Sequence, residues 1–423
     1  MGHSLLDTRV RVFANDRVWM EDAALQQLHT TAGLAGMRAA VGLPDLHPGR
    51  GYPVGAAFFS VGRLYPALVG GDIGCGMALY ETELRPHKTS ASRLAQALGC
   101  IDGRLPDHAV SPEARAALHD IAQRAELFTA DELVASLGTI GGGNHFAELQ
   151  VVDQVHEPGV VDAKRVHLLV HSGSRGLGSA ILRAHIDGYN HGGLAAGDEA
   201  ARQYLAQHDA ALAFAELNRA HIAQRMAQAL RTDLRPVLAL SHNHVLPHVW
   251  GGEAGFLHRK GATPADQGLV VIPGSRGDHS HVLRPVAGRH EALDSLAHGA
   301  GRKWARADCR GRLKPRFSLT ELLQTRFGSA VVCADKALVY EEAPQAYKDV
   351  DAVVATLIEA GLVVPVARLR PLLTYKKGAL DQPDAEDEAG RRPRDGRGRP
   401  GKASNHASGQ VSGKTPRGGL PCC

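Results

Sequence analysis

Four short runs of aliphatic residues recur along the chain, each beside a turn rich in glycine or histidine. They lie in ALVGGDIGCG (67–76), RVHLLVHSGSRG (165–176), RPVLALSHNH (235–244) and GLVVIPGSRG (268–277). Runs of four to six aliphatic residues bounded by glycine are typical of buried β-strands. Polar side chains at the ends of such strands, on turns where glycine allows close approach, commonly form binding sites. The pattern predicts buried sheets with a site at the strand ends.

Two other segments have helical patterns. Thr129-Ala-Asp-Glu132 is a capping box, and the short apolar-periodic run that it starts ends at Gly138. Residues 198–231 are rich in alanine, contain no proline and place apolar residues at a loose helical spacing. Strands and helices together predict a mixed α/β (α+β) fold in which helices flank the buried sheets.

The composition changes sharply near residue 379. The segment 379–423 has almost no aliphatic residues and carries an acidic run followed by an Arg/Gly/Pro run, so it cannot bury enough apolar area to order itself. We therefore expect a disordered tail over 379–423 and one large domain over 1–378. The 44% of apolar and 22% of charged residues in the 423-residue chain are ordinary for a globular protein.

The chain shows no sign of a membrane or secretory destination. No apolar stretch approaches the ~20 residues of a membrane span, and the first ten residues, MGHSLLDTRV, lack the apolar region of a secretory signal. The six cysteines are scattered, without a C-x-x-C pair, which argues against a disulfide framework or a zinc ribbon. We expect a soluble, cytoplasmic protein.

The strand ends carry a set of good metal ligands. Histidine is abundant, with 23 residues, and is the commonest metal ligand in proteins. Any one histidine alone is more simply read as a buried structural residue, but the shared strand-end context favours a site. One carboxylate, one thiolate and three imidazoles exceed what a four-coordinate zinc site needs, and a thiolate can bridge two ions. The candidates are Asp72, Cys75, His145, which follows Asn144, His171 and His242.

The charge of such a site predicts its chemistry. Two divalent ions carry +4, and Asp72 with a deprotonated Cys75 carries −2, which leaves +2 on the site. This net charge suits a triphosphate or RNA phosphates and favours phosphoryl chemistry over redox chemistry. Four glycine-rich turns, at 141–143, 172–176, 274–277 and 298–302, could present backbone N–H groups to phosphates. None of them follows the dinucleotide fingerprint, which disfavours a nicotinamide enzyme.

Eight motifs follow one another along the chain. They are PDLHPGRG (44–51), GGDIGCGM (70–77), GGGNHFAE (141–148), HSGSRGLG (171–178), RKGAT (259–263), IPGSRG (272–277), HGAGR (298–302) and AYKDVD (346–351). In this order they resemble the motifs of the RtcB family of RNA-splicing ligases, and most of all its shorter bacterial members. The resemblance extends from about Asp45 to Gly378.

The resemblance implies a role for each matching residue. It implies that Cys75 bridges two Mn²⁺ ions, with Asp72 and His145 on one ion and His171 and His242 on the other. His298 matches the histidine that attacks GTP and becomes guanylylated. Asn144 and Ser275 match contacts to the nucleotide's phosphates, as does Arg302. The guanine would be held by Glu148, Ser280, Tyr347 and Lys377, and further active-site positions are Asp45, Arg175 and Lys260.

The chain departs from the family pattern in three places. Arg50 stands where Lys is frequent, and Arg276 replaces the usual Met of the IPGSMG turn. Both are expected near the site, where they could shift RNA preference. Lys377-Gly378 is normally the C-terminus of the chain, so the segment after it must leave Lys377 accessible.

The resemblance therefore implies a GTP- and Mn²⁺-dependent RNA ligase. It would join RNA 3′-phosphate or 2′,3′-cyclic-phosphate ends to 5′-hydroxyl ends, in RNA splicing or repair. The alternative is a two-metal phosphoesterase that hydrolyses cyclic phosphates without ligation. A non-catalytic RNA-binding protein is disfavoured, because aromatic residues are only 5% and the sequence shows no evident basic stripe. The physiological RNA, an activating protein partner and the oligomeric state stay open.

Overall fold

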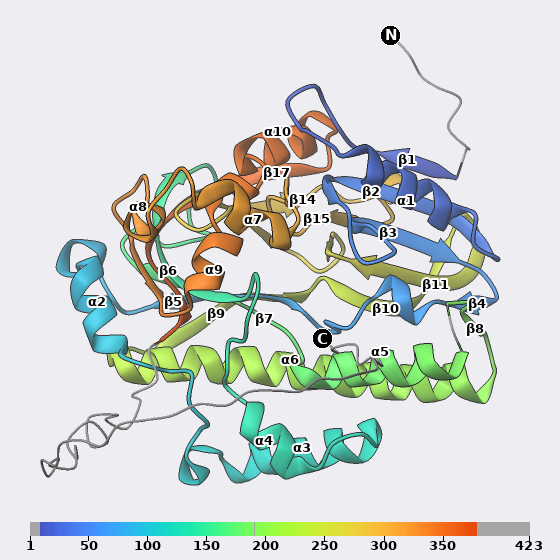
Figure 1. The fold of residues 1–423 in the computed structure, drawn as a ribbon, viewed down its shortest axis with the longest axis horizontal. Helices are drawn as coiled ribbons and strands as arrows, with labels where there is room; N and C mark the ends of the chain where they lie inside the picture. Colours follow the sequence, from blue (N-terminus) through green and yellow to red (C-terminus); the bar gives the residue numbers. More distant parts are fainter. Residues whose placement is uncertain (1–8, 190, 379–423) are drawn as a thin grey trace, which may run out of the picture. The chain divides into compact units, whose positions relative to one another are not determined.

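The larger of the two main sheets has eight strands, is mostly antiparallel (Figure 1) and carries Glu148, His171, Ser280 and Lys377 of the residues expected at the site. The structure is a computed structural model that describes residues 9–189 and 191–378. The strand order is β13-β14-β17-β6-β7-β5-β9, and β16 pairs with β17 in parallel. The strands are β5 (Gly76–Thr82), β6 (Phe146–Val155), β7 (Val166–Ser172), β9 (Leu234–Ser241), β13 (Val270–Pro273), β14 (Ser280–Pro285), β16 (Ala330–Cys333) and β17 (Val363–Lys377).

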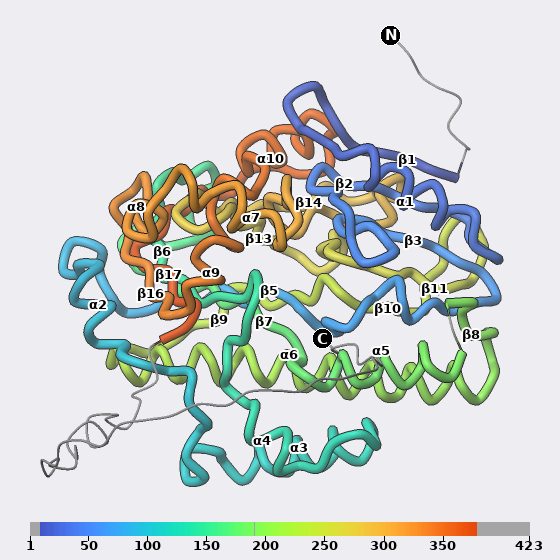
Figure 2. Tube along the Cα trace, in the orientation of Figure 1, coloured from blue at the N-terminus to red at the C-terminus, as the bar shows by residue number. Residues whose placement is uncertain are grey.

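A second sheet has five strands in the order β1-β2-β3-β11-β10, and two two-stranded ladders, β12 with β15 and β4 with β8, complete the described strands. In Figure 2, β5, β7 and β9 lie side by side although they come from distant parts of the chain. The bounds are β1 (Val10–Val12), β2 (Met37–His47), β3 (Val54–Ser60), β4 (Arg63–Leu64), β8 (Leu194–Ala195), β10 (Asn243–Trp250), β11 (Glu253–Lys260), β12 (Ala262–Pro264) and β15 (Ser295–Ala297).

Helices cover the sheets and fill the connections between strands (Figure 1). The long helix is α6 (Glu199–Leu230). On the same side of the structure lie α2 (Ala91–Leu98), α3 (Pro112–Ala125), α4 (Ala130–Ser136) and α5 (Gly176–Tyr189). The others are α1 (Asp22–Ala32), α7 (Arg306–Leu313), α8 (Leu319–Leu323), α9 (Lys336–Glu341) and α10 (Val350–Glu359). Single 3₁₀ turns are η1 (Pro66–Leu68), η2 (Pro86–Lys88), η3 (Asp107–Ala109), η4 (His290–Ala292) and η5 (Pro344–Ala346).

Helix α6 forms the centre of one hydrophobic layer. Its 32 residues extend for about 48 Å at 1.5 Å per residue, and it runs along the strands with α3 and α4 on its other side (Figure 1). Ile222 and Met226 of α6 pack against Leu168 and Val170 of β7, and all four are fully buried. This packing fixes the ends of β5, β7 and β9 relative to one another.

Strands of the two large sheets meet at His242. Strand β9 ends at Ser241 in the eight-stranded sheet, and β10 begins at Asn243 in the five-stranded sheet. The His242 amide donates to the carbonyl of Cys75 (2.8 Å), and the His242 carbonyl accepts from Ala262 (3.0 Å). The junction of the sheets thus brings separate chain segments together where polar side chains were predicted.

The patterns of the sequence predict several of these elements. The capping box at Thr129 and Glu132 is present and starts α4, and the helix expected over 198–231 is α6. Strands form in three of the four aliphatic runs, as β7, β9 and β13. The expectation that these strands are buried holds for β7 and β13, whereas β9 is largely half-buried or exposed.

The prediction of a strand in the first aliphatic run, at residues 67–69, is wrong. Pro66 begins the 3₁₀ turn η1 there, and the amides of Val69 and Gly70 both donate to the Pro66 carbonyl at 3.1 Å. Proline favours the first position of a helical turn because its φ is already helical and the missing N–H has no partner there. The sheet strand follows the glycine-rich turn, at Gly76, and does not precede it.

Two further expectations from the sequence concern the C-terminal tail and membrane spans. The predicted tail, 379–423, lies outside the described residues, and the boundary after residue 378 stays a prediction. Within the described ranges, no helix is both long and apolar enough to cross a membrane.

Gly76 offers a test of the packing at the sheet junction. A Cβ atom on Gly76 would lie 2.1 Å from the carbonyl oxygen of Leu240, whereas a Cβ on the exposed Gly188 of α5 would have no atom within 4 Å. We expect Gly76→Ala to lower the free energy of unfolding by about 1–3 kcal/mol through overpacking. Gly188→Ala should leave it unchanged or raise it by up to about 1 kcal/mol. Denaturant unfolding of the wild type and both variants measures these changes. A Gly76→Ala midpoint equal to that of the wild type would contradict the prediction.

Candidate active site

The five predicted metal ligands converge at the sheet junction. Cys75 is central, with its Sγ 3.2 Å from Nε2 of His145 and 3.1 Å from Nε2 of His171. On one side, His145 Nε2 lies 2.9 Å from the Asp72 carboxylate. On the other side, His171 Nε2 lies 3.4 Å from His242 Nε2. The arrangement has a carboxylate and an imidazole on one side of the sulfur and two imidazoles on the other.

The proton positions fit a cation at this cluster. His145 and His171 each place Nδ1 near a backbone carbonyl, those of Ile140 (3.2 Å) and Asn144 (3.1 Å). A proton on Nδ1 leaves the Nε2 lone pair directed at the cluster, as metal-binding histidines require. Ligand atoms that share one ion at about 2.0–2.3 Å can lie no more than about 4.5 Å apart, and the separations above are all shorter. The donor set therefore fits a transition metal.

Burial sets the protonation of the cluster when no metal is bound. Burial, with the nearby Asp72 charge second, raises the pKa of the Cys75 thiol well above its usual value. Burial also lowers the pKa values of His171 and His242, which stay neutral. Burial acts to raise the pKa of Asp72, but His145 outweighs it and holds that pKa below its usual range. A metal that binds here must displace the thiol proton, so its affinity rises with pH.

Helix α6 supports the cluster from behind with two buried polar residues. Arg219 donates to the carbonyls of Gly74 (2.6 Å) and Ser172 (3.1 Å), each next to or near a ligand. Asn218 donates to the carbonyl of Gly173 and to the Ser172 hydroxyl, both at 3.2 Å. Because α6 is long and packed along its length, these side chains hold the ligand-bearing turns in place.

His298 lies beside the metal cluster and is held by one carboxylate. Its ring centroid is 4.8 Å from that of His242. Asp45, which is fully buried in β2, accepts from the His298 amide (3.0 Å) and from His298 Nδ1 (2.6 Å). This pairing places the ring proton on Nδ1 and leaves the Nε2 lone pair free. His298 therefore has the tautomer of a nucleophile.

A buried lysine fixes the segment that carries Asp45. The Lys348 ammonium donates to the carbonyls of Pro44 (3.0 Å) and Leu46 (2.7 Å), the two neighbours of Asp45. Its backbone amide donates to the carbonyl of Gly301 (2.9 Å), in the turn that begins at His298. Lys348 is 5% exposed, and burial lowers its pKa to about 8. The sequence analysis did not single out this residue, although it lies within the AYKDVD motif.

A second group of buried polar residues lies along β6, β14 and β17. Gln150 donates to Glu148 (2.6 Å) and to the Ser280 hydroxyl (2.7 Å), and the Thr374 hydroxyl donates to the other oxygen of Glu148. Burial raises the pKa of Glu148 to about 7. Glu148 and Ser280, predicted to hold guanine, are thus joined through Gln150, which sequence reasoning missed.

Glu342 is the centre of the charges next to this group. It is 3% exposed in its side chain, and its carboxylate lies 3.2 Å from Arg302 and 3.6 Å from both Arg306 and Lys376. The Tyr347 hydroxyl donates to it as well. One carboxylate facing three cations leaves the cluster with a net positive charge, which suits a phosphate-bearing ligand. Glu342, Arg306 and Lys376 were not predicted.

Arg306 connects the two groups, because its guanidinium also lies 3.4 Å from the side-chain oxygen of Asn144, the residue before His145. Arg302 is more enclosed. All five of its N–H groups have protein acceptors in this structure, so Arg302 holds its protein neighbours in place without a ligand. Those acceptors are the Glu342 carboxylate, the Tyr347 hydroxyl, the Cys309 sulfur and the carbonyls of Trp304 and Glu341.

Lys377, predicted to hold guanine, lies at the end of β17. Its side chain is about half exposed and lies 3.5 Å from Asp335. The preceding residue, Lys376, is buried and contacts Glu342, and its charge partly offsets the rise that burial causes in the pKa of Glu148. Two adjacent lysines in a strand point in different directions, so the sequence alone could not say which one faces the pocket.

The remaining predicted residues lie around the two groups. Arg175 donates to the Thr139 hydroxyl (3.1 Å) and packs against Gly141. Lys260 donates to the Ala67 carbonyl (3.1 Å), and burial lowers its pKa to about 8. Ser275 lies in the turn between β13 and β14, where its carbonyl accepts from Asp278.

Arg276, expected near the site, points into the structure. It is buried, and its guanidinium donates to the carbonyls of Leu322 in α8 (2.8 Å) and Val339 in α9 (3.2 Å). These contacts tie two short helices to the turn before β14. An effect of Arg276 on RNA preference stays a prediction.

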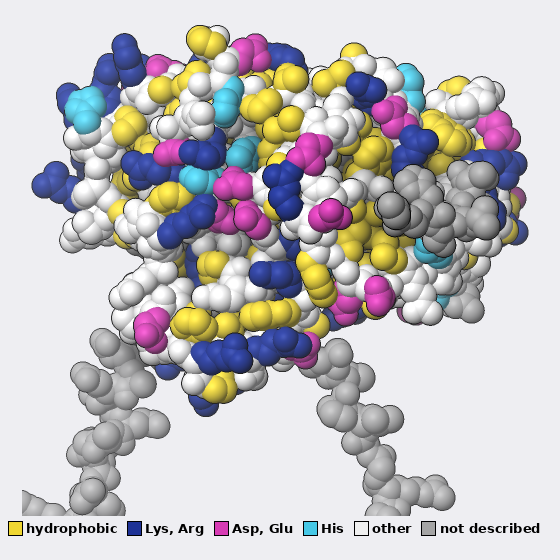
Figure 3. Space-filling view, turned by 90° about the horizontal axis from the view of Figure 1, so that it is seen from above, with side chains coloured by type: hydrophobic (Ala, Val, Ile, Leu, Met, Phe, Trp, Pro, Cys, Tyr) yellow, Lys and Arg dark blue, Asp and Glu magenta, His cyan; other side chains and the backbone are white. Residues whose placement is uncertain are grey.

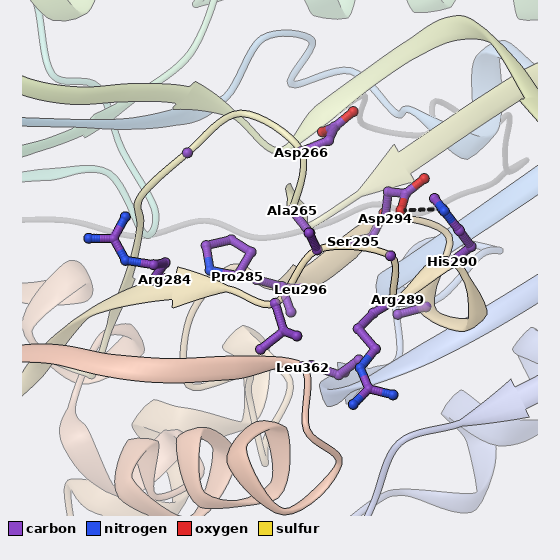
Figure 4. Close-up of a pocket in the computed structure, with 15 residues that line it drawn as sticks. Ala265, Asp266, Arg284, Pro285, Arg289, His290, Asp294, Ser295, Leu296 and Leu362 are labelled. Atoms are coloured by element: carbon purple, nitrogen blue, oxygen red, sulfur yellow. Dashed lines mark hydrogen bonds and ion pairs between the residues drawn. The ribbon is translucent and has the colours of Figure 1, made fainter.

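A surface pocket of about 510 Å³ lies elsewhere, beside β14 and η4, and Figure 4 shows its lining. None of the predicted site residues lines it. Its charged side chains are already paired within the protein, His290 with Asp294 (2.9 Å) and Arg284 with Glu157 (2.6 Å). The pocket therefore lacks a free charged group for a ligand at these positions.

The arrangement places a group of residues that could hold a metal ion beside a positively charged cluster at the junction of two sheets, and comparisons with known proteins identify the family of the chain. The family model described as tRNA-splicing ligase RtcB matches residues 27–130 and 113–377. The chain therefore belongs to the RtcB family, and the expectation of a ligase-family enzyme is confirmed. The order of motifs in the sequence was sufficient to recognise it.

Relatives of this family match nearly the whole chain. An RNA-splicing ligase RtcB2 of Escherichia coli is 51% identical over 383 residues, which cover 88% of this chain and 96% of the relative. The RNA-splicing ligase RtcB of E. coli strain K12 is 31% identical, covering 89% of this chain and all of the relative. The tRNA-splicing ligase RtcB of Thermococcus kodakarensis is 30% identical, covering 86% and 93%.

The central position of Cys75 predicts how its replacement changes the metal content of the protein. If its sulfur is shared by two ions, Cys75→Ala should reduce bound Mn²⁺ from about two ions per chain to near zero, because both sides lose a ligand. Cys100→Ala, which changes an exposed cysteine, should keep the wild-type content. Metal analysis of the purified proteins measures this. One ion retained at full occupancy in Cys75→Ala would contradict a shared thiolate.

Proposed function

We propose that this protein is a GTP- and Mn²⁺-dependent RNA ligase that acts through a guanylylated His298. It joins RNA 3′-phosphate or 2′,3′-cyclic-phosphate ends to 5′-hydroxyl ends, in RNA splicing or repair. The observation that carries the proposal is the position of His298. Its Nδ1 is held by Asp45, so its Nε2 is free, and its ring lies against His242 of the metal cluster.

The residues present fit the metals and the nucleotide that the proposal requires. Asp72, Cys75, His145, His171 and His242 would hold two Mn²⁺ ions, since a thiolate and imidazoles suit a transition metal. Bound ions would supply Lewis-acid neutralisation of phosphate charge. Glu148 and Ser280, with Tyr347 and Lys376, would hold the guanine and the charge of the nucleotide, and the net positive surroundings of Glu342 favour an anionic ligand.

The first step forms a bond between His298 and GMP. The Nε2 lone pair of His298 attacks the α-phosphorus of GTP, a P–N bond forms, and the bond to the β-phosphate oxygen breaks, so that pyrophosphate leaves. The imidazole keeps its Nδ1 proton, and Asp45 stabilises the positive charge that develops on the ring. Asp45 is already in place for this, because its oxygen accepts from both the ring and the His298 amide.

The later steps use the RNA ends. An oxygen of the RNA 3′-phosphate attacks the phosphorus of GMP on His298, the P–N bond breaks, and the 3′ end becomes activated by GMP. The 5′-hydroxyl then loses its proton as it attacks the 3′-phosphorus, and GMP leaves with its electron pair. A 2′,3′-cyclic phosphate is first opened by water to the 3′-phosphate.

The alternative function is a two-metal phosphoesterase that uses the same five ligands. It would need neither His298 as a nucleophile nor the buried polar group around Glu148. The presence of both favours ligation. We also propose the division into a ligase domain over 1–378 and a dispensable tail over 379–423, and cytoplasmic action with RNA as partner.

The covalent guanylate tests the proposal directly. Wild-type protein incubated with Mn²⁺ and GTP should gain one GMP, located by mass spectrometry on His298, and should ligate RNA with 3′-phosphate and 5′-hydroxyl ends. His298→Ala should keep its metal but lose both the adduct and ligation, because the attacking nitrogen is gone. The exposed His87→Ala is the control. GMP located on another residue, or cyclic-phosphate hydrolysis without GTP dependence, would contradict the proposal.

Lys348 predicts a defect in rate without a defect in GTP binding. Lys348→Met removes the ammonium that holds both neighbours of Asp45 while keeping an unbranched side chain that is one heavy atom shorter. Because Asp45 then orients His298 less well, we expect guanylylation to slow by about 10–100-fold, as for residues that orient a reacting group from behind. The KM for GTP should stay near wild type. Lys336→Met, at an exposed lysine, is the matched control, and an unchanged rate for Lys348→Met would refute the role.

A further inference from the structure

The segment 302–316 concentrates the positive charge of the protein. It contains seven basic residues and one acidic residue, Asp308, for a net charge of +6. Because the whole chain carries +4, all other residues together carry −2. On the face seen in Figure 3, Lys and Arg side chains lie in several groups with Asp and Glu between them. The small net charge of the whole chain therefore does not reveal this local excess of positive charge, and no basic stripe was predicted.

Helix α7 arranges these charges in a line. Cys309 and Leu313 of the helix are buried and face the protein. Arg306, Arg310 and Lys314 follow one another at i, i+4 and i+8 and are exposed. Residues four apart share a helix face and are separated by about 6 Å along the axis. A spacing of this order resembles that of neighbouring phosphates along a nucleic-acid strand.

The outer charges of this line have no side-chain partners among residues 9–189 and 191–378. No hydrogen bond or ion pair to another described residue involves the side chains of Arg310, Lys314 or Arg316. Surface cations in this protein are commonly paired, as Arg235 is with Glu81 and Arg368 with Asp153. Asp308 is the one carboxylate within 302–316 that could offset the line. Unpaired cations beside each other repel, and an anionic ligand relieves that repulsion.

The line begins at the active site. Arg306, its first exposed member, contacts Asn144 next to the metal ligand His145, and also Glu342. Segment 302–316 starts four residues after His298 and leads from the site to the surface. Trp304 adds an aromatic ring that already stacks with a cation, with the Arg312 guanidinium 5.2 Å from its centroid.

We propose that the exposed cations of 306–316 form a track that binds the phosphate backbone of single-stranded RNA and leads its end into the site. The inference rests on the proposed ligase function and specifies how that function holds its substrate. Contacts of this kind go to phosphates, so they position the strand without reading its sequence. An acidic protein partner is the competing occupant, and a test with purified RNA separates the two.

The test compares two triple variants. Arg310→Gln, Lys314→Gln and Arg316→Gln together remove the outer track. Arg11→Gln, Lys88→Gln and Lys164→Gln remove the same charge from exposed positions on other elements. Binding of a 3′-phosphorylated single-stranded RNA is measured by fluorescence anisotropy over a range of salt concentrations. The track variant should bind at least tenfold more weakly, and the slope of log K against log salt should fall by about 2, near 0.7 per lost contact.

Guanylylation measured without RNA separates this inference from the proposed function. Both variants should form the GMP adduct at the wild-type rate, while the track variant shows a raised KM for RNA in ligation. If wild-type protein forms no adduct, the proposed function fails whatever the RNA affinity shows. Wild-type RNA affinity and salt slope in the track variant would overturn the track. So would equal losses in both triple variants, or a loss of guanylylation in the track variant alone.

Discussion

The constraint on which the site depends is the packing of a buried thiol and three buried imidazoles at one point, beside a partly exposed carboxylate. Cys75 lies within 3.2 Å of two imidazole nitrogens whose other nitrogens face backbone carbonyls. Lone pairs directed at each other in a dry interior are unfavourable unless a cation or a proton lies between them. The ordinary way for a protein to keep such a cluster is to bind metal. The junction of the two sheets at His242 brings the ligands together.

The sequence predicts this cluster well because its residues belong to short local signals. Each ligand lies near the end of a strand, Asp72, Cys75 and His145 on turns with glycine, and the chemistry of Asp, Cys and His is specific enough to suggest a metal. The order of motifs then identified the family. The strand expected at residues 67–69 failed because Pro66 starts a 3₁₀ turn there, a local preference that outweighs an aliphatic run of only three residues.

The sequence could not predict the residues that support the predicted site residues through hydrogen bonds and packing. Arg219 lies in the middle of α6 and holds the turns that carry Cys75 and His171, and nothing in its neighbours distinguishes it from other helical arginines. Gln150 and Lys376 are similar cases, because their importance comes from the strand face on which they lie. Pairing of β6 with β17 places Glu148 opposite Thr374, and that register depends on long-range contacts that a pattern along the chain does not contain.

The AYKDVD segment shows how the two halves of the site are coupled. Tyr347 and Lys348 are adjacent in extended backbone, and this stretch pairs with the turn after His298 through the Lys348 amide and Gly301 and through the bridge between Tyr347 and Arg302. The Tyr347 side chain contacts Glu342, whereas that of Lys348 holds the neighbours of Asp45. A shift of this extended stretch would move the polar group around Glu342 and the orientation of His298 together. If a nucleotide binds beside Glu342, as proposed, its binding would also stabilise the carboxylate of Asp45 that holds His298, so binding and orientation would be linked through two consecutive residues.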